Sequence, residues 1–145
     1  KRVGLEIHYW PHWQTGEAIE GWKEREVERF LNETGKEKVN VIGKSIGTLV
    51  AVMALNKNIK IVNKIVLCGV PVYDLRPGDG DNYQVLARLR PGRVMVIQNE
   101  KDNHGSFDDV AKMMASISQN ILMVSRPRED HHYPYAPDFE NFLAG

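Results

Sequence analysis

The chain has 145 residues, of which 42% are hydrophobic and 26% are charged, and its 19 basic and 19 acidic residues leave no formal net charge. This is typical of one soluble globular domain, so we expect a single domain over residues 1–145. The balanced charge argues against a nucleic-acid partner, and no apolar run approaches the ~20 residues that span a bilayer. A single cysteine, Cys68, excludes an internal disulfide and indicates a reducing, cytoplasmic compartment. It lies in an apolar run, and we interpret it as a core residue.

Strand-like and helix-like segments alternate along the chain. Strand patterns lie at residues 3–10, 39–42, 64–70, 93–98 and 120–125. Helix patterns lie at residues 17–32, 45–56, 81–89, 106–117 and 137–143. Strands that are apolar throughout are expected where helices cover both faces of a parallel sheet. We therefore predict a single-domain α/β fold, with a mostly parallel sheet and helices on both faces.

A glycine-flanked serine lies between the second strand pattern and the helix pattern that follows it, in the sequence Gly43-Lys44-Ser45-Ile46-Gly47. This arrangement is typical of the nucleophile elbow of serine hydrolases. The glycines are needed because the strand and the helix pass close together beneath the serine. The turn exposes the hydroxyl of Ser45 and directs the backbone N–H of Ile46 toward a developing oxyanion. We therefore interpret Ser45 as a candidate nucleophile and Ile46 as a candidate oxyanion donor.

Candidate partners for the serine lie in two later loops. A serine hydroxyl becomes a good nucleophile when a base accepts its proton and an acid orients that base. In a parallel sheet such groups belong on loops at the carboxyl ends of strands. Two loops qualify: residues 98–105, which contain Asp102, and residues 126–133, which contain His131. The chain order Ser45, Asp102, His131 is the order used in hydrolases of this fold class.

Together these motifs resemble those of the α/β-hydrolase superfamily, among its small, lidless esterase-like members. The matching pieces, in the family's order, are residues 43–47, 99–105 and 130–133. The resemblance implies that Asp102 is the acid. It also implies that His131 is the base, because the family has an aromatic residue two positions after the base. His132 is an adjacent alternative for the base, and Asp74, after the third strand, is an alternative for the acid.

One part of the family's site has no good match before Ser45. The family takes a second oxyanion N–H from a loop after an earlier strand, and we expect this segment, with the N-terminal strands, upstream of Lys1 or absent. Candidate pocket residues are Lys44, Tyr9, Trp10 and His12. Lys44 directly precedes the serine, where a cation favours anionic substrates. The other three lie at the end of the first strand pattern or just after it, at the same edge of the sheet as the elbow.

The sequence therefore predicts a cytoplasmic serine hydrolase that cleaves a small ester, thioester or related acyl substrate. Its partner is a small molecule, and we expect no organic cofactor. We also expect no metal, since the single cysteine excludes a Cys-x-x-Cys pair. The alternative is a catalytically silent α/β-hydrolase scaffold that acts as a binding module, which the missing oxyanion segment favours. The oligomeric state is left open.

Overall fold

The computed structural model of the protein describes residues 20–145. The strand expected at residues 3–10 and the pocket candidates Tyr9, Trp10 and His12 lie outside this range. The strands are β1 (Val39–Lys44), β2 (Val62–Cys68), β3 (Val94–Asn99) and β4 (Leu122–Arg126). The helices are α2 (Trp22–Thr34), α3 (Ile46–Lys57), α4 (Phe107–Ile117) and α5 (Ala136–Ala144), with the 3-10 helices η1 (Ile59–Ile61) and η2 (Asp79–Arg88).

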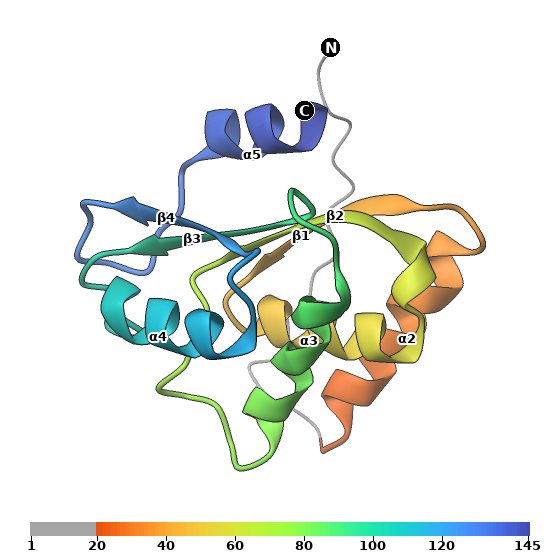
Figure 1. Ribbon diagram of the computed structural model, residues 1–145. Helices are drawn as coiled ribbons and strands as arrows, with labels where there is room; N and C mark the ends of the chain where they lie inside the picture. The colour runs from red at the N-terminus through yellow and green to blue at the C-terminus, as the bar shows by residue number, and fades with distance from the viewer. Residues whose placement is uncertain (1–19) are drawn as a thin grey trace.

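The described strands form one parallel sheet in the order β1-β2-β3-β4, which is also their order in the chain. Helices α2, α3 and α4 lie on one face of the sheet, and α5 lies on the other (Figure 1). This confirms the predicted parallel sheet with helices on both faces. All four strands therefore end at the same edge of the sheet, where the loops that follow them meet.

Two predicted segments differ from the structure in detail. The third strand was expected at residues 64–70, but β2 ends at Cys68 because Gly69 adopts a left-handed φ of 65° that turns the chain out of the sheet. The helix expected at residues 81–89 is the 3-10 helix η2, which begins earlier, at Asp79. The remaining described elements agree with their predicted ranges to within two residues, apart from the start of α2, which is Trp22 rather than residue 17.

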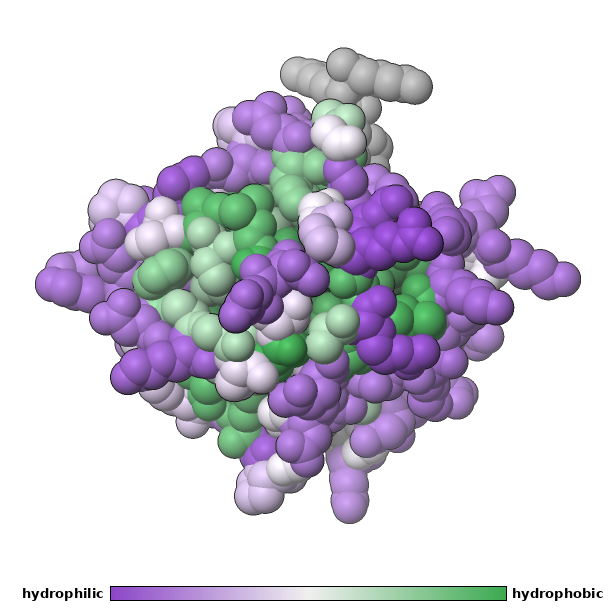
Figure 2. All heavy atoms as spheres, in the orientation of Figure 1, coloured by the Kyte–Doolittle hydropathy of each residue, from purple (hydrophilic) through white to green (hydrophobic). Residues whose placement is uncertain are grey.

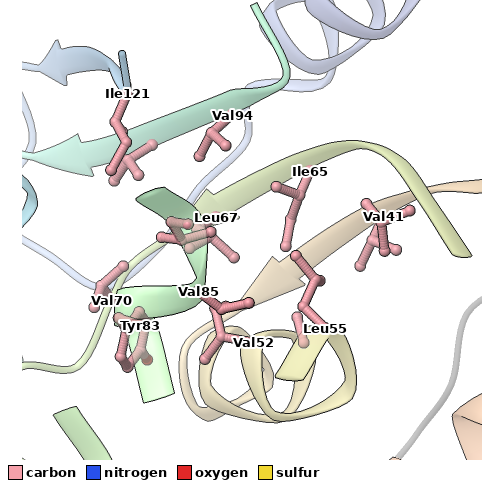
Figure 3. Close-up of a cluster of buried hydrophobic side chains, with 14 of the residues drawn as sticks. Val41, Val52, Leu55, Ile65, Leu67, Val70, Tyr83, Val85, Val94 and Ile121 are labelled. Atoms are coloured by element: carbon pink, nitrogen blue, oxygen red, sulfur yellow. The ribbon is translucent and has the colours of Figure 1, made fainter. Parts of the chain in front are cut away.

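The core has one layer on each face of the sheet, and β2 contributes to both. Ile65 and Leu67 point to the α3 face (Figure 3), whereas Val66 and Cys68 belong to the cluster on the α5 face. This alternation follows from the two-residue period of a strand. All four side chains are at most 2% exposed, so the burial on both faces explains why the strand is apolar throughout.

Helix α3 carries apolar residues around most of its circumference, because it lies between the sheet and helix α2. Leu49, Val52 and Leu55 pack toward the sheet, while Val50 and Ala54 pack against α2. A helix that is hydrophobic all round is a buried one. The buried position of α3 fixes its first turn beneath the end of β1, which is where Ser45 lies.

The outer surface is mixed in character. Figure 2 shows hydrophilic residues around most of the rim of one face, with hydrophobic residues visible between them toward the middle. Among residues 20–145, the large hydrophobic side chains that remain exposed are Tyr73 and Leu122. Within the same range, each helix is too short or too polar to cross a bilayer.

Strand β1 and helix α3 approach closely at Gly43. A Cβ atom added there would lie 2.9 Å from the carbonyl oxygen of Gly47 and 3.1 Å from Cα of Thr48. Both are backbone atoms, so Gly43→Ala must displace the helix, and we expect it to lower the free energy of unfolding by about 1–3 kcal/mol. The measurement is equilibrium unfolding in urea. Gly80→Ala is the matched control, because a Cβ at Gly80 meets nothing within 4 Å. An equal loss of stability in both variants would contradict this account of Gly43.

Cys68 is a core residue, as the sequence predicts, and its thiol should be inert in the native protein. Burial raises its pKa to about 12, although nearby Lys44 lowers it. At pH 8 the thiolate fraction of such a group is on the order of one part in ten thousand. We therefore expect Ellman's reagent to modify Cys68 only in urea-unfolded protein. Rapid, stoichiometric reaction of the native protein would show that the thiol is accessible.

Candidate active site

Ser45 occupies a strained turn between β1 and α3. Its φ of 55° and ψ of −128° make it the one non-glycine residue with positive φ in the range 20–145. The turn is held by its backbone N–H, which donates to the carbonyl of Cys68 at 3.0 Å. Strained conformations of this kind persist where the surroundings impose them, and they cluster at functional sites. Ile46 is the first residue of α3, so its N–H lies at the positive end of a helix.

A buried tyrosine supports the turn from below. The N–H and the hydroxyl of Thr48 donate to the carbonyl of Ser45 at 2.9 and 2.7 Å. The Thr48 hydroxyl also contacts the hydroxyl of Tyr83 at 2.7 Å, and because it already donates to Ser45, Tyr83 is the donor in that bond. Burial raises the pKa of Tyr83, which keeps its hydroxyl protonated. This support is not predictable from the sequence pattern, because Tyr83 lies far from Ser45 in the chain.

Asp102 lies in the loop after β3, and its carboxylate is fully buried. One carboxylate oxygen, Oδ2, accepts hydrogen bonds from Nδ1 of His131 at 2.7 Å and from the hydroxyl of Tyr133. The other, Oδ1, accepts from the backbone N–H of His104 at 2.8 Å. A buried carboxylate needs such donors, because an unpaired charge away from water is costly. The structure thus brings Asp102 and His131 together, as the sequence predicts.

The ring of His131 is held in place, but one of its nitrogen atoms is free. It packs on His104 with ring centroids 4.4 Å apart, and on the edge of Tyr133 at 5.8 Å. Nε2 is buried and has no hydrogen-bond partner among the described residues. The expected hydrogen bond between Ser45 and His131 is therefore not formed in this structure. In enzymes without bound substrate such bonds are often long, and they tighten when substrate binds.

The alternative acid and base are placed elsewhere. Asp74 pairs with His104, whose Nδ1 lies 2.5 Å from Oδ2 of Asp74. His132 is exposed, and its backbone N–H donates to Asp130 at 3.1 Å. The structure therefore groups Asp102 with His131, and Asp74 with His104.

Asn99, the last residue of β3, anchors the loop that carries His131. Its side-chain amide donates to the carbonyls of Asp130 and His132, at 2.9 and 2.8 Å, on either side of His131. Its side-chain oxygen accepts from the hydroxyl of Tyr135 at 2.5 Å. Asn99 is fully buried, so this network fixes the backbone on both sides of the histidine. Asn99 was not among the predicted site residues; its signal in the sequence is an amide at the end of an otherwise apolar strand.

Gln98, the residue before Asn99, joins the loops after β2 and β3 by hydrogen bonds from its side chain. Its amide group donates to the carbonyl of Gly105 at 2.6 Å, and its oxygen accepts from the N–H of Val70 at 2.9 Å. A Cβ at Gly105 would lie 2.6 Å from the carbonyl oxygen of Val70, so only a glycine allows the two loops to approach this closely. Gln98 and Gly105 therefore fix the loop that carries Asp102.

Lys44 lies exposed at the carboxyl end of β1, directly before Ser45 and opposite Cys68 in the sheet register. Its suggested role in substrate binding stays a prediction. Among residues 20–145, no group of three or more His, Cys, Asp or Glu side chains is arranged to hold a metal ion.

The fold has counterparts among solved structures. One is the N-formylmaleamic acid deformylase Nfo from Pseudomonas putida S16, with a TM-score of 0.63 and 13% identity over 85% of this chain and 73% of that chain. Another is MGS-MChE2, an α/β-hydrolase enzyme from a sediment metagenome of the lagoon of Mar Chica, Morocco, with a TM-score of 0.58 and 17% identity over 85% of this chain and 66% of that chain. No protein-family model and no curated protein matches the sequence. The likeness is one of architecture, and it shows that this chain has an α/β-hydrolase-like fold.

Proposed function

We propose that the protein is a serine hydrolase that cleaves a small ester, thioester or related acyl substrate, with Ser45 as nucleophile, His131 as base and Asp102 as acid. The observation that carries this proposal is the pairing of Nδ1 of His131 with buried Asp102, which leaves Nε2 buried and without a hydrogen-bond partner among residues 20–145. The strained turn at Ser45 and the hydrolase-like fold support it. A cytoplasmic location, suggested by the single cysteine, belongs to the same proposal.

The proposed reaction uses each group in the state that its contacts favour. Because Nδ1–H of His131 donates to Asp102, Nε2 of the neutral ring is an acceptor. Nε2 takes the proton of the Ser45 hydroxyl as the oxygen attacks the substrate carbonyl, and the N–H of Ile46 stabilises the oxyanion. His131 then protonates the leaving group, and water releases the acyl group from Ser45 by the same steps.

The alternative, a catalytically silent scaffold, is favoured by one observation. The Ser45–His131 hydrogen bond is not formed in this structure, so Nε2 of His131 does not accept the serine proton in the state described. A scaffold of this kind would bind its partner without activating Ser45.

A fluorophosphonate probe distinguishes the two candidates. The probe bonds covalently to a serine oxygen that a histidine has activated, so we expect the wild-type protein to be labelled at Ser45 and Ser45→Ala to be unlabelled. Esterase turnover of Ser45→Ala should fall by about 10⁴-fold or more. The measurements are intact-protein mass spectrometry and hydrolysis of p-nitrophenyl esters.

The two adjacent histidines provide the matched control. His131→Ala should lose labelling, whereas His132→Ala should keep most of it, because the ring of His131 pairs with Asp102 and His132 is exposed. A folded wild-type protein that takes up no probe would favour the silent scaffold. Labelling lost in His132→Ala and kept in His131→Ala would move the base to His132.

A further inference from the structure

Asp102 shares one carboxylate oxygen between two donors. Oδ2 accepts from His131 Nδ1 at 2.7 Å and from the Tyr133 hydroxyl at 2.5 Å. The tyrosine therefore competes with the histidine for the same negative charge. A hydrogen bond to a carboxylate stabilises its charged form and weakens its pull on any other cation. Asp102 thus has a second side-chain hydrogen-bond donor, the Tyr133 hydroxyl, which has no role in the proposed reaction.

The hydroxyl of Tyr133 is oriented rather than free to rotate. The backbone N–H of Asn99 donates to the tyrosine oxygen at 3.1 Å, so the tyrosine's own proton is directed to Asp102. The ring is also constrained, because it packs directly against the backbone of Gly69. A Cβ atom added at Gly69 would lie only 2.6 Å from Cε2 of the ring. Burial raises the pKa of Tyr133, and the hydroxyl therefore remains a donor across the pH range in which a histidine titrates.

We propose that Tyr133 is a positioning residue, whose hydroxyl sets the orientation of the Asp102 carboxylate and limits the negative charge that it offers to His131. Its effect on turnover rests on the proposed function, but its effect on His131 does not. Two consequences follow: the hydroxyl holds the carboxylate in the orientation that His131 needs, and it lowers the pH at which His131 becomes protonated.

Tyr133→Phe tests this, because it keeps the ring and removes the hydroxyl. In an NMR titration of the ¹³Cε1 signal of His131, identified by its loss in His131→Asn, we expect the midpoint to rise by roughly 0.5 pH unit or more. Among the described residues, His104 packs on the ring of His131 and is paired with Asp74, and Cys68 lies near Tyr133. The substitution leaves all three unchanged. In the esterase assay kcat should fall about tenfold with little change in KM.

Tyr135→Phe is the matched control. Tyr135 lies in the same loop, packs edge-on against Tyr133 at 5.9 Å, and donates its hydroxyl to Asn99 instead of Asp102. Tyr135→Phe removes one contact of the Asn99 network but no hydrogen bond to Asp102, so we expect the His131 midpoint to stay unchanged even though the loop loses an anchor. If Tyr133→Phe does not fold, uniform 3-fluorotyrosine, whose hydroxyl is a stronger donor, should lower the midpoint.

Failure of the Tyr133 proposal can be distinguished from failure of the proposed hydrolase function, because the titration of His131 needs no turnover. A midpoint that does not move in folded Tyr133→Phe, or that does not move with 3-fluorotyrosine, overturns the positioning role. An equal rise in Tyr135→Phe also overturns it, because the effect would then belong to the loop as a whole. A wild-type protein without hydrolysis or probe labelling overturns the proposed function, while the midpoints still decide the role of Tyr133.

Discussion

The hydrogen bond between Asp102 and His131 is the interaction on which the candidate site depends. It joins the loop after β3 to the loop after β4, and it fixes which nitrogen of the histidine is left for chemistry. The buried carboxylate of Asp102 is satisfied, because three donors among the described residues surround it: His131, Tyr133 and the N–H of His104. Removal of one partner from such a group costs more than an ordinary hydrogen bond, because the charge stays buried.

The parallel sheet makes this interaction possible by delivering the loops to one edge. Gln98 and Asn99, the last residues of β3, then use buried amide groups to tie the neighbouring loops together. Glycines at the contact points, Gly69 and Gly105, leave room that any side chain would fill. The site is therefore built mainly from backbone positions and buried amide contacts.

Much of this arrangement is predictable from the sequence, because it depends on local patterns. The apolar runs and their spacing predict the strands and helices, and the glycines around Ser45 predict the strained turn. Contacts between distant loops were not predictable in the same way. Periodicity carries no information on whether Asp74 or Asp102 reaches His131, since both follow strands that end at the same edge. The roles of Tyr83, Asn99 and the Tyr133 hydroxyl also depend on side-chain geometry across the fold.

The central role of Asp102 is tested most directly by comparing Asp102→Asn with Asp74→Asn. Asp102→Asn keeps the shape of the side chain, but its amide can no longer stabilise a protonated His131. We expect kcat/KM for a p-nitrophenyl ester to fall by about 10⁴-fold. Asp74→Asn, which changes the partner of His104, should retain kcat/KM within about threefold, as expected for a surface substitution. Near-normal turnover by folded Asp102→Asn, or the larger loss in Asp74→Asn, would contradict the account.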